Sequence, residues 1–192
     1  QEILERLQME REVRNHWRNL VVAATGTGKT VMAASDYKLF AGKHERARLL
    51  FIAHREEILK QSLRTFQQVL CDYNFGEKWY GGHEPSNYEY VFASKDTLNN
   101  RIDTFNLPRD YYDYIVIDEA HHIPAGSYQK IISYFNPKVL LGLTATPERM
   151  DGQNILKDFN YRTAAEIRLP DALNNKLLCP FQYFGISDAV DY

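Results

Sequence analysis

The sequence predicts an α/β domain in which a mainly parallel sheet carries helices on both faces. Two observations point to this class. Short apolar runs recur along the chain, and most of them lead through a turn into a segment with helical periodicity. Such an alternation of strands and helices builds a parallel sheet, because each crossover helix packs back onto the sheet.

The individual elements are expected from hydrophobic periodicity and from turn residues. The first helix mixes apolar residues with charges and is expected on the surface, and Gly42 follows the second helix as a C′ glycine does. The expected helices cover residues 1–15, the segment after the first glycine-rich turn up to Phe40, residues 56–70 and residues 128–135. The expected strands cover residues 20–23, 49–53, 90–93, 114–117 and 139–143.

The last part of the sequence no longer shows the alternation of apolar runs and helical segments. Pro170 and Pro180 bracket a short expected helix, and residues 181–186 have the pattern of a further strand. We therefore assign residues 1–168 to one domain and residues 169–192 to a connector that leads toward a second domain.

Length and composition exclude several classes of protein. With 192 residues, 44% of them hydrophobic and 25% charged, the chain supports one ordinary globular domain with a substantial core. The apolar runs are too short to cross a bilayer, so no membrane partner is expected. Cys71 and Cys179 lie far apart in a sequence without a secretory leader, which favours a cytoplasmic location. A net charge of −2 argues against nucleic-acid binding through the overall field, although a local cluster of cations can still bind.

A glycine-bearing turn after the first strand predicts a phosphate site. Residues 23–30 read A-A-T-G-T-G-K-T, so that backbone N–H groups of the turn and the N-terminus of the next helix face an anion. Lys29 can reach the β- and γ-phosphates of a nucleotide, and the Thr30 hydroxyl can bind Mg²⁺. Ala23 replaces the first glycine of the usual pattern, which is tolerable if its φ is negative. The candidate nucleotide-binding residues are Thr25, Gly26, Thr27, Gly28, Lys29 and Thr30.

A pair of carboxylates follows a second apolar run. Residues 118–121 read D-E-A-H directly after the expected strand at 114–117. Asp118 can hold Mg²⁺ together with Thr30, and Glu119 can orient or activate a water molecule. With Lys29, these carboxylates predict hydrolysis of a nucleoside triphosphate. A zinc hydrolase that uses His121 and the adjacent histidine is disfavoured, because neighbouring histidines do not easily share one tetrahedral ion.

Further polar residues follow other strands, where ligands gather at the edge of a parallel sheet. His54 and Arg55 come after the second expected strand and are candidates for contact with the nucleic-acid backbone. Ser94 and Thr97 follow the next strand and are equally suited to phosphate contact and to helix capping.

The ordered segments resemble motifs I, Ia, Ib, II and III of superfamily 2 helicases. They read A-A-T-G-T-G-K-T, F-I-A-H-R, F-A-S-K-D-T-L, D-E-A-H and L-T-A-T-P-E-R. The stretches A-H-R-E-E-I-L and T-A-T-P-E-R-M-D-G are most similar to the bacterial proteins grouped with the restriction subunit of type III restriction enzymes. This resemblance implies a RecA-like P-loop NTPase domain that binds ATP and Mg²⁺ and moves on nucleic acid, DNA more than RNA. It also implies that His121, Thr144 and Thr146 couple the nucleotide state to the grip on nucleic acid.

The resemblance further implies a second RecA-like domain of the same protein, which brings an arginine finger. Motifs IV to VI are absent from this sequence, and the glutamine motif would fall at or just before Gln1. We therefore expect this chain alone to hydrolyse ATP weakly. The alternative is a nucleotide-binding sensor or clamp subunit without turnover of its own. The intact set of catalytic residues favours the motor.

Overall fold

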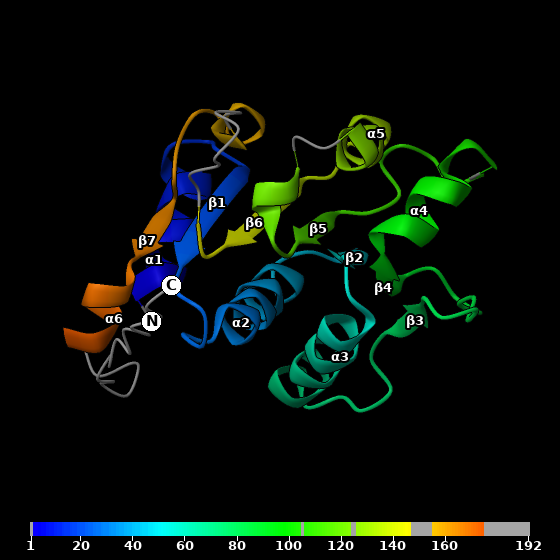
Figure 1. Cartoon of the computed structure of the whole chain (residues 1–192), viewed down its shortest axis with the longest axis horizontal. Coiled ribbons are helices and arrows are strands. Elements are labelled where there is room, and N and C mark those ends of the chain that lie inside the picture. The colour runs from blue at the N-terminus through cyan, green and yellow to red at the C-terminus, as the bar shows by residue number, and fades with distance from the viewer. Residues whose placement is uncertain (1, 105, 124–125, 147–154, 175–192) are drawn as a thin grey trace, which may run out of the picture.

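Seven parallel strands form one sheet, in the order β3-β4-β2-β5-β6-β1-β7. This is seen in a computed structural model, which describes residues 2–104, 106–123, 126–146 and 155–174 (Figure 1). Every pairing between neighbouring strands of the described chain is parallel, and helices cover both faces. The expected α/β class is therefore confirmed.

Most elements lie where the sequence predicts them. The strands are β1 (Arg18–Ala23), β2 (Leu49–Ala53), β3 (Glu77–Trp79), β4 (Tyr90–Ser94), β5 (Tyr114–Ile117), β6 (Val139–Thr144) and β7 (Ala165–Ile167). The helices are α1 (Glu2–Gln8), α2 (Lys29–Ala41), α3 (Glu56–Leu70), α4 (Lys95–Arg101), α5 (Gly126–Tyr134) and α6 (Leu169–Asn174). A π-helical segment, η1 (Met9–Val13), continues α1, and short 3-10 segments form η2 (Ile102–Thr104), η3 (Ala120–His122) and η4 (Ile155–Phe159). No helix in the described ranges is both long and apolar enough to cross a membrane.

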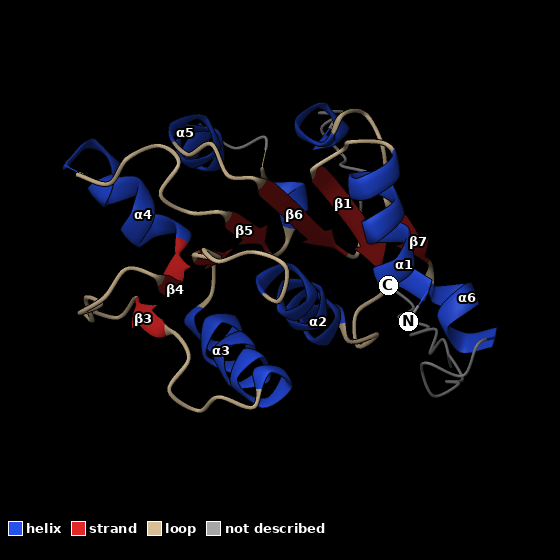
Figure 2. Cartoon of the chain, turned by 180° about the vertical axis from the view of Figure 1, so that it is seen from behind, coloured by secondary structure: helices blue, strands red, loops and turns tan. Residues whose placement is uncertain are grey.

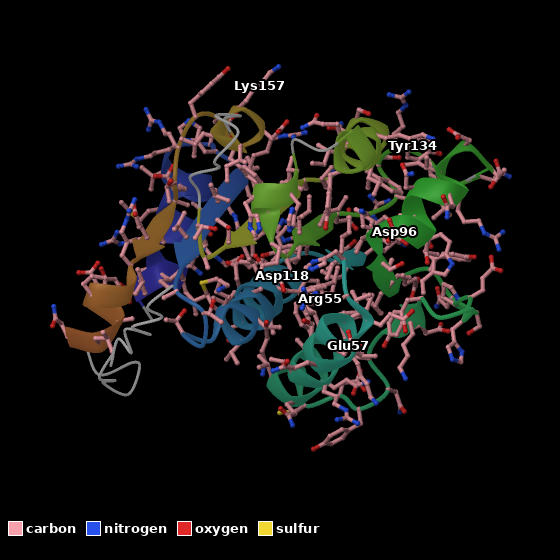
Figure 3. All side chains as sticks on the ribbon, in the orientation of Figure 1. Arg55, Glu57, Asp96, Asp118, Tyr134 and Lys157 are labelled. Carbon is pink, nitrogen blue, oxygen red and sulfur yellow. The ribbon has the colours of Figure 1, made fainter. Side chains whose placement is uncertain are left out.

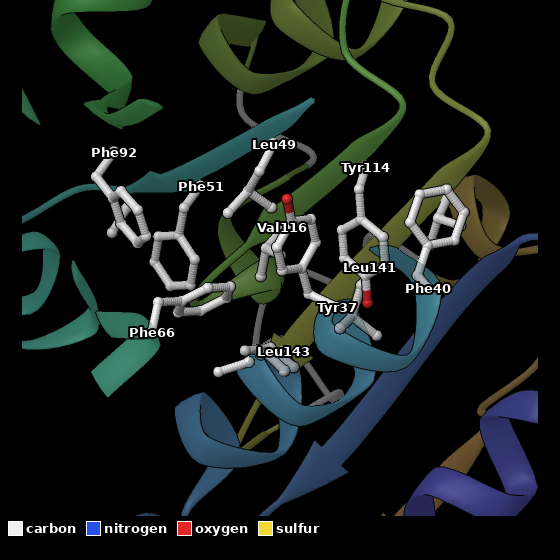
Figure 4. Packing of buried hydrophobic residues seen from close by; sticks show 14 of the residues in the cluster. Tyr37, Phe40, Leu49, Phe51, Phe66, Phe92, Tyr114, Val116, Leu141 and Leu143 are labelled. Carbon is white, nitrogen blue, oxygen red and sulfur yellow. The ribbon is translucent and has the colours of Figure 1, made fainter. Parts of the chain in front are cut away.

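Each face of the sheet has its own apolar cluster. Helices α2 and α3 cover one face and α4 and α5 the other, as the front and back views both show (Figures 1 and 2). On the α2–α3 side, Phe51 of β2 packs on Phe66 of α3 and Phe92 of β4, with ring centroids 5.7 and 5.3 Å apart (Figure 4). Leu50 and Ile52 of the same strand belong to the opposite cluster. All five residues of β2 are buried, as a strand at the centre of a covered parallel sheet requires.

A buried ion pair fixes the N-terminal segment to this sheet. Arg11 of η1 donates two hydrogen bonds to the carboxylate of Asp36 on α2, at 2.9 and 2.8 Å, and one to Asn19 on β1, at 2.7 Å. The Tyr114 hydroxyl of β5 donates to the same carboxylate. Arg11 is only 6% exposed and Asp36 only 1%. The segment expected on the surface is thus clamped to α2, β1 and β5, and removing one charge would leave the other buried and unpaired.

The parallel register places five strand ends at one edge. Val22 pairs with Thr144, Ile117 with Gly142, and Ile52 with Ile117. Only glycine fits at position 142, because a Cβ there would lie 2.4 Å from the Phe159 ring and 3.1 Å from the Ala120 side chain. The turn after β5 therefore packs directly on β6.

The structure corrects several details of the expected elements. Gly42 follows α2 with φ −66°, so the helix ends without the left-handed glycine that a C′ position implies. The strands β3 and β7 were not expected, because three residues are too few to show a period. Residues 181–186 lie outside the described ranges, and the division at residue 168 stays a prediction.

Candidate functional site

The turn between β1 and α2 is built around two glycines. Gly26 and Gly28 have φ values of 86° and 83°, in the left-handed region that glycine adopts without strain. The Thr27 N–H and hydroxyl both donate to the Ala24 carbonyl oxygen, at 3.3 and 2.7 Å. Gly28 is the N-cap residue of α2, and no side chain caps this end. The first N–H groups of α2 are therefore available to an anion. Ala23 ends β1 without a positive φ, as the sequence required.

Lys29 is folded back over this turn. Its Nζ donates to the carbonyl oxygens of Ala23 at 2.9 Å and Ala24 at 3.4 Å. Burial lowers the pKa of Lys29, while the charges of Asp118 and Glu119 act in the opposite direction. The ammonium group thus lies within electrostatic reach of both carboxylates. Thr25 is exposed on the turn, and Thr30 is half-buried in the first turn of α2.

The carboxylate pair follows β5 at the same edge (Figure 3). Asp118 is only 7% exposed, and its N–H donates to the Ile52 carbonyl oxygen of β2 at 2.9 Å. Burial, and then the charge of Glu119, raises the pKa of Asp118 to about 6. Glu119 has φ 53° and ψ 50°, a left-handed conformation that costs a residue with a side chain about 1–2 kcal/mol. A buried acid beside a strained residue is typical of a functional site.

The residues expected to act in coupling are in direct contact. His121 Nδ1 lies 3.1 Å from Thr144 Oγ1 and 3.1 Å from Glu119 Oε2. The Thr144 hydroxyl donates to the Thr146 carbonyl oxygen at 3.0 Å, so its oxygen accepts the hydrogen bond from a protonated His121 Nδ1. The structure therefore joins the turn after β5 to the end of β6. The role of His121, Thr144 and Thr146 in coupling stays a prediction.

His54 and Arg55 directly follow β2, the strand that lies between β4 and β5 in the sheet. His54 is half-buried, and its pKa is lowered by burial and then by the charge of Arg55. Arg55 is exposed and precedes α3 in an extended conformation. Arg55 therefore lies at the carboxyl end of β2, close enough to His54 for its charge to act on that ring (Figure 3).

Ser94 acts as a helix cap. Its Oγ accepts the Thr97 N–H of α4 at 3.1 Å and donates to Thr97 Oγ1 at 2.8 Å. The capping alternative is therefore confirmed for Ser94, which is 9% exposed, while contact of either residue with nucleic acid stays a prediction. Sequence reasoning passed over Lys95, whose Nζ lies 5.9 Å from the Tyr128 ring centroid and 3.1 Å from Asp96. The sequence did indicate Lys95 as a candidate, because this residue directly follows an expected strand, as His54 and Arg55 do.

A cleft of about 720 Å³ opens beside the glycine turn. Its walls include Ile3 of α1, Thr27 and Gly28 of the turn, Val31 of α2 and Ile167 of β7. Val31 leaves 51% of its surface exposed toward solvent. A cleft of mixed character, lined also by Glu2, Arg6, Glu166 and Asp171, therefore adjoins the open N-terminus of α2.

The donors at this edge suit magnesium better than zinc. Within the described ranges, no three His, Cys, Asp or Glu side chains gather into a metal-binding cluster. Mg²⁺ prefers oxygen ligands and commonly binds one or two protein donors together with substrate phosphates. The Asp118 carboxylate and the Thr30 hydroxyl are donors of this kind.

A family model described as "Type III restriction enzyme, res subunit" matches residues 1–149. The "51.5 kDa protein" of Lactococcus phage (isolate 7-9) is 29% identical over 167 residues, which cover 87% of this chain and 32% of that protein. The "DNA 3'-5' translocase XPB2" of Sulfurisphaera tokodaii is 27% identical over 146 residues, which cover 72% of this chain and 29% of that protein. This chain spans about a third of the length of these two relatives.

A solved structure shares the fold. It is a nuclease-deletion mutant of the Type ISP restriction-modification enzyme LlaGI in complex with a DNA substrate mimic. Its TM-score with this chain is 0.72 at 14% identity, and the match covers 92% of this chain and 20% of the other. At this identity the likeness concerns the fold alone.

Replacement of Asp118 by Asn is predicted to stabilise the protein when no magnesium or nucleotide is present. A carboxyl whose pKa is raised on folding lowers stability wherever it is ionised, so the penalty is full above about pH 6 and disappears as the pH falls toward 3.8. A shift of this size corresponds to about 1–3 kcal/mol. The amide side chain of Asp118→Asn would keep an oxygen to accept the Glu119 N–H.

The measurement is urea unfolding of both proteins in EDTA between pH 7 and pH 4. We expect Asp118→Asn to be more stable at pH 7, with a difference that shrinks as the pH falls. A variant that is less stable than the wild type at pH 7, or a difference independent of pH, would contradict the stated environment of Asp118.

Proposed function

The chain belongs to the family of the type III restriction enzyme res subunit, and on this premise we propose that it is the ATP-binding motor domain of a nucleic-acid-dependent helicase or translocase. The observation that carries the proposal is the uncapped N-terminus of α2 together with its first residue, Lys29, on which the charges of Asp118 and Glu119 act. Cation, anion-binding turn and acid pair are the parts that triphosphate hydrolysis needs.

The triphosphate would lie along the glycine turn. Backbone N–H groups between Thr25 and Thr30, other than that of Thr27, which donates to Ala24, would bind phosphate oxygens. The Lys29 ammonium would leave the Ala23 and Ala24 carbonyl oxygens to meet the β- and γ-phosphates. The neighbouring cleft beside Val31 has room for the nucleoside. Asp118 and Thr30 would hold Mg²⁺, which neutralises charge on the phosphate oxygens when bound.

Hydrolysis would proceed by in-line attack of water. The water oxygen forms a bond to the γ-phosphorus, the bond from that phosphorus to the bridging oxygen breaks, and the water proton passes to the Glu119 carboxylate. His121 Nδ1, 3.1 Å from Glu119 Oε2, orients this carboxylate. Lys29 stabilises the negative charge on the transferred group.

Nucleic acid would be held by its backbone. Arg55 is exposed at the start of α3, and His54 and Lys95 lie beside it at the ends of β2 and β4. These cations sit at strand ends and not on a recognition helix, so they would contact phosphates without reading bases. The relatives support DNA as the track: one is named a DNA translocase, and LlaGI was solved with a DNA substrate mimic.

Lys29 and Glu119 are predicted to have separable effects on the nucleotide. Lys29→Ala removes a charged hydrogen bond to phosphate and should weaken Mg·ATP binding by about 1.5–3 kcal/mol. Glu119→Gln keeps the shape and should bind Mg·ATP normally but lose hydrolysis, because the amide cannot accept the proton. Calorimetry measures the binding, and single-turnover assays with enzyme in excess measure the hydrolysis. Lys60→Ala, on the exposed face of α3, is the matched control. Equal affinity of Lys29→Ala and Lys60→Ala would refute the assignment of the phosphate site.

Arg55 is predicted to contribute to binding through one phosphate contact. Affinity for single-stranded DNA should fall with rising salt and vary little with base sequence. Arg55→Ala should reduce the slope of log affinity against log salt by about 0.7, the value for one contact to a single strand. Fluorescence anisotropy over a range of salt concentrations measures this slope. Arg64→Ala, also exposed on α3, should leave it unchanged. Strong sequence discrimination, or an equal effect of both variants, would contradict backbone contact at Arg55.

A further inference from the structure

A row of histidine rings crosses the edge of the sheet from β2 to β6. The centroid of the His54 ring lies 5.4 Å from that of His122, at an interplanar angle of 67°. The His122 ring lies 4.1 Å from the ring of His121. His121 Nδ1 in turn is 3.1 Å from both Glu119 Oε2 and Thr144 Oγ1. These contacts connect the end of β2 to Glu119 without a gap.

We propose that His122 is a positioning residue through which nucleic-acid contact at the end of β2 changes the orientation of Glu119. This inference rests on the proposed function and deepens it, since it names the side chain that joins the two sites. His122 lies between a ring beside the exposed Arg55 and a ring that contacts the carboxylate of Glu119.

The backbone around His122 is built to transmit a displacement. Residues Ala120–His122 form a single 3-10 turn, η3, and the His122 N–H donates to the Glu119 carbonyl oxygen at 3.0 Å. Glu119 holds a left-handed conformation at the start of this turn. Ala120 is fully buried and packs where a Cβ on Gly142 would clash, so the turn has little freedom to slide. The His122 side chain is itself exposed, so a displacement of its ring reaches Glu119 through the backbone of this turn and the hydrogen bond from the His122 N–H to the Glu119 carbonyl oxygen.

The His54 ring is held in a way that allows it to respond to a ligand. Its Nδ1 is buried and has no hydrogen-bond partner among the described residues. The charged or titratable groups that act on it are Arg55, Lys95, Glu119 and His121. Two of these are the cations proposed to bind phosphate. A phosphate bound to them would lie against the His54 ring, and the contact between the two rings passes a change in its position to His122.

The test measures coupling at equilibrium. The dissociation constant of a fluorescent, non-hydrolysable Mg·ATP analogue is determined for this chain without DNA and with a saturating short single-stranded DNA of mixed sequence. We expect DNA to change the constant by about fivefold or more in the wild type, the lower end of typical coupling between sites. His122→Ala should bring this ratio close to one while leaving each separate affinity unchanged. His122→Phe, which restores an aromatic ring, should retain most of the ratio.

The matched control is His83→Ala, which removes an exposed histidine from the loop after β3 and should keep the wild-type ratio. A second readout needs no nucleotide: the DNA should shift the imidazole NMR signals of His121 in the wild type and in His122→Phe, but not in His122→Ala. Failure to bind the analogue would refute the proposed function, and the NMR comparison would still decide the role of His122. Unchanged coupling in His122→Ala, a wild-type ratio of one, or an undiminished NMR shift in His122→Ala would overturn the inference.

Discussion

The parallel register of the sheet is the constraint on which the site depends. Backbone pairing aligns Ala53 with Ser94, Ile52 with Ile117, and Val22 with Thr144. Five strands therefore end within about three residues of each other, and the segments that follow them meet although they lie far apart in the sequence. Parallel strands are slow to pair because their contacts are non-local, but once paired they define an edge with the rigidity of the whole core. The glycine turn, the acid pair and the histidine row all start from this edge.

The rigidity of that edge supports features that are unfavourable in isolation. Asp118 is buried with a raised pKa, and Glu119 is held in a left-handed conformation. Both reduce the stability of the protein without ligand, and under the proposed function both supply carboxylate oxygens to the phosphate and its metal ion. On the opposite side of the sheet from α4 and α5, the Arg11–Asp36 pair clamps η1 to α2, the helix that carries Lys29. We interpret this clamp as support for the turn, because it restrains α2 from its middle.

The local sequence pattern predicted the central strands and helices closely but missed the two outermost strands of the sheet. Residues 49–53 and 56–70 were expected as strand and helix and have these bounds in the structure, because a buried apolar run and an amphipathic repeat are both visible in sequence. The strands β3 and β7 were missed, since their place depends on neighbours rather than on their own three residues. The same limit applies to the site. The turn at residues 23–30 and the acids at 118–119 follow from local chemistry, whereas the Arg11–Asp36 pair and the contact of His54 with His122 arise only from tertiary packing.

The central claim is that the triphosphate and its metal ion bind at the carboxyl ends of the strands. The most direct test replaces Mg²⁺ with paramagnetic Mn²⁺, together with a non-hydrolysable ATP analogue, and records the broadening of backbone amide NMR signals. The account predicts the strongest broadening in residues 24–30 and at Asp118 and Glu119, with a decrease along each strand toward Leu49, Tyr114 and Val139 at the amino ends. Broadening centred on those amino ends, or spread evenly over the sheet, would contradict it.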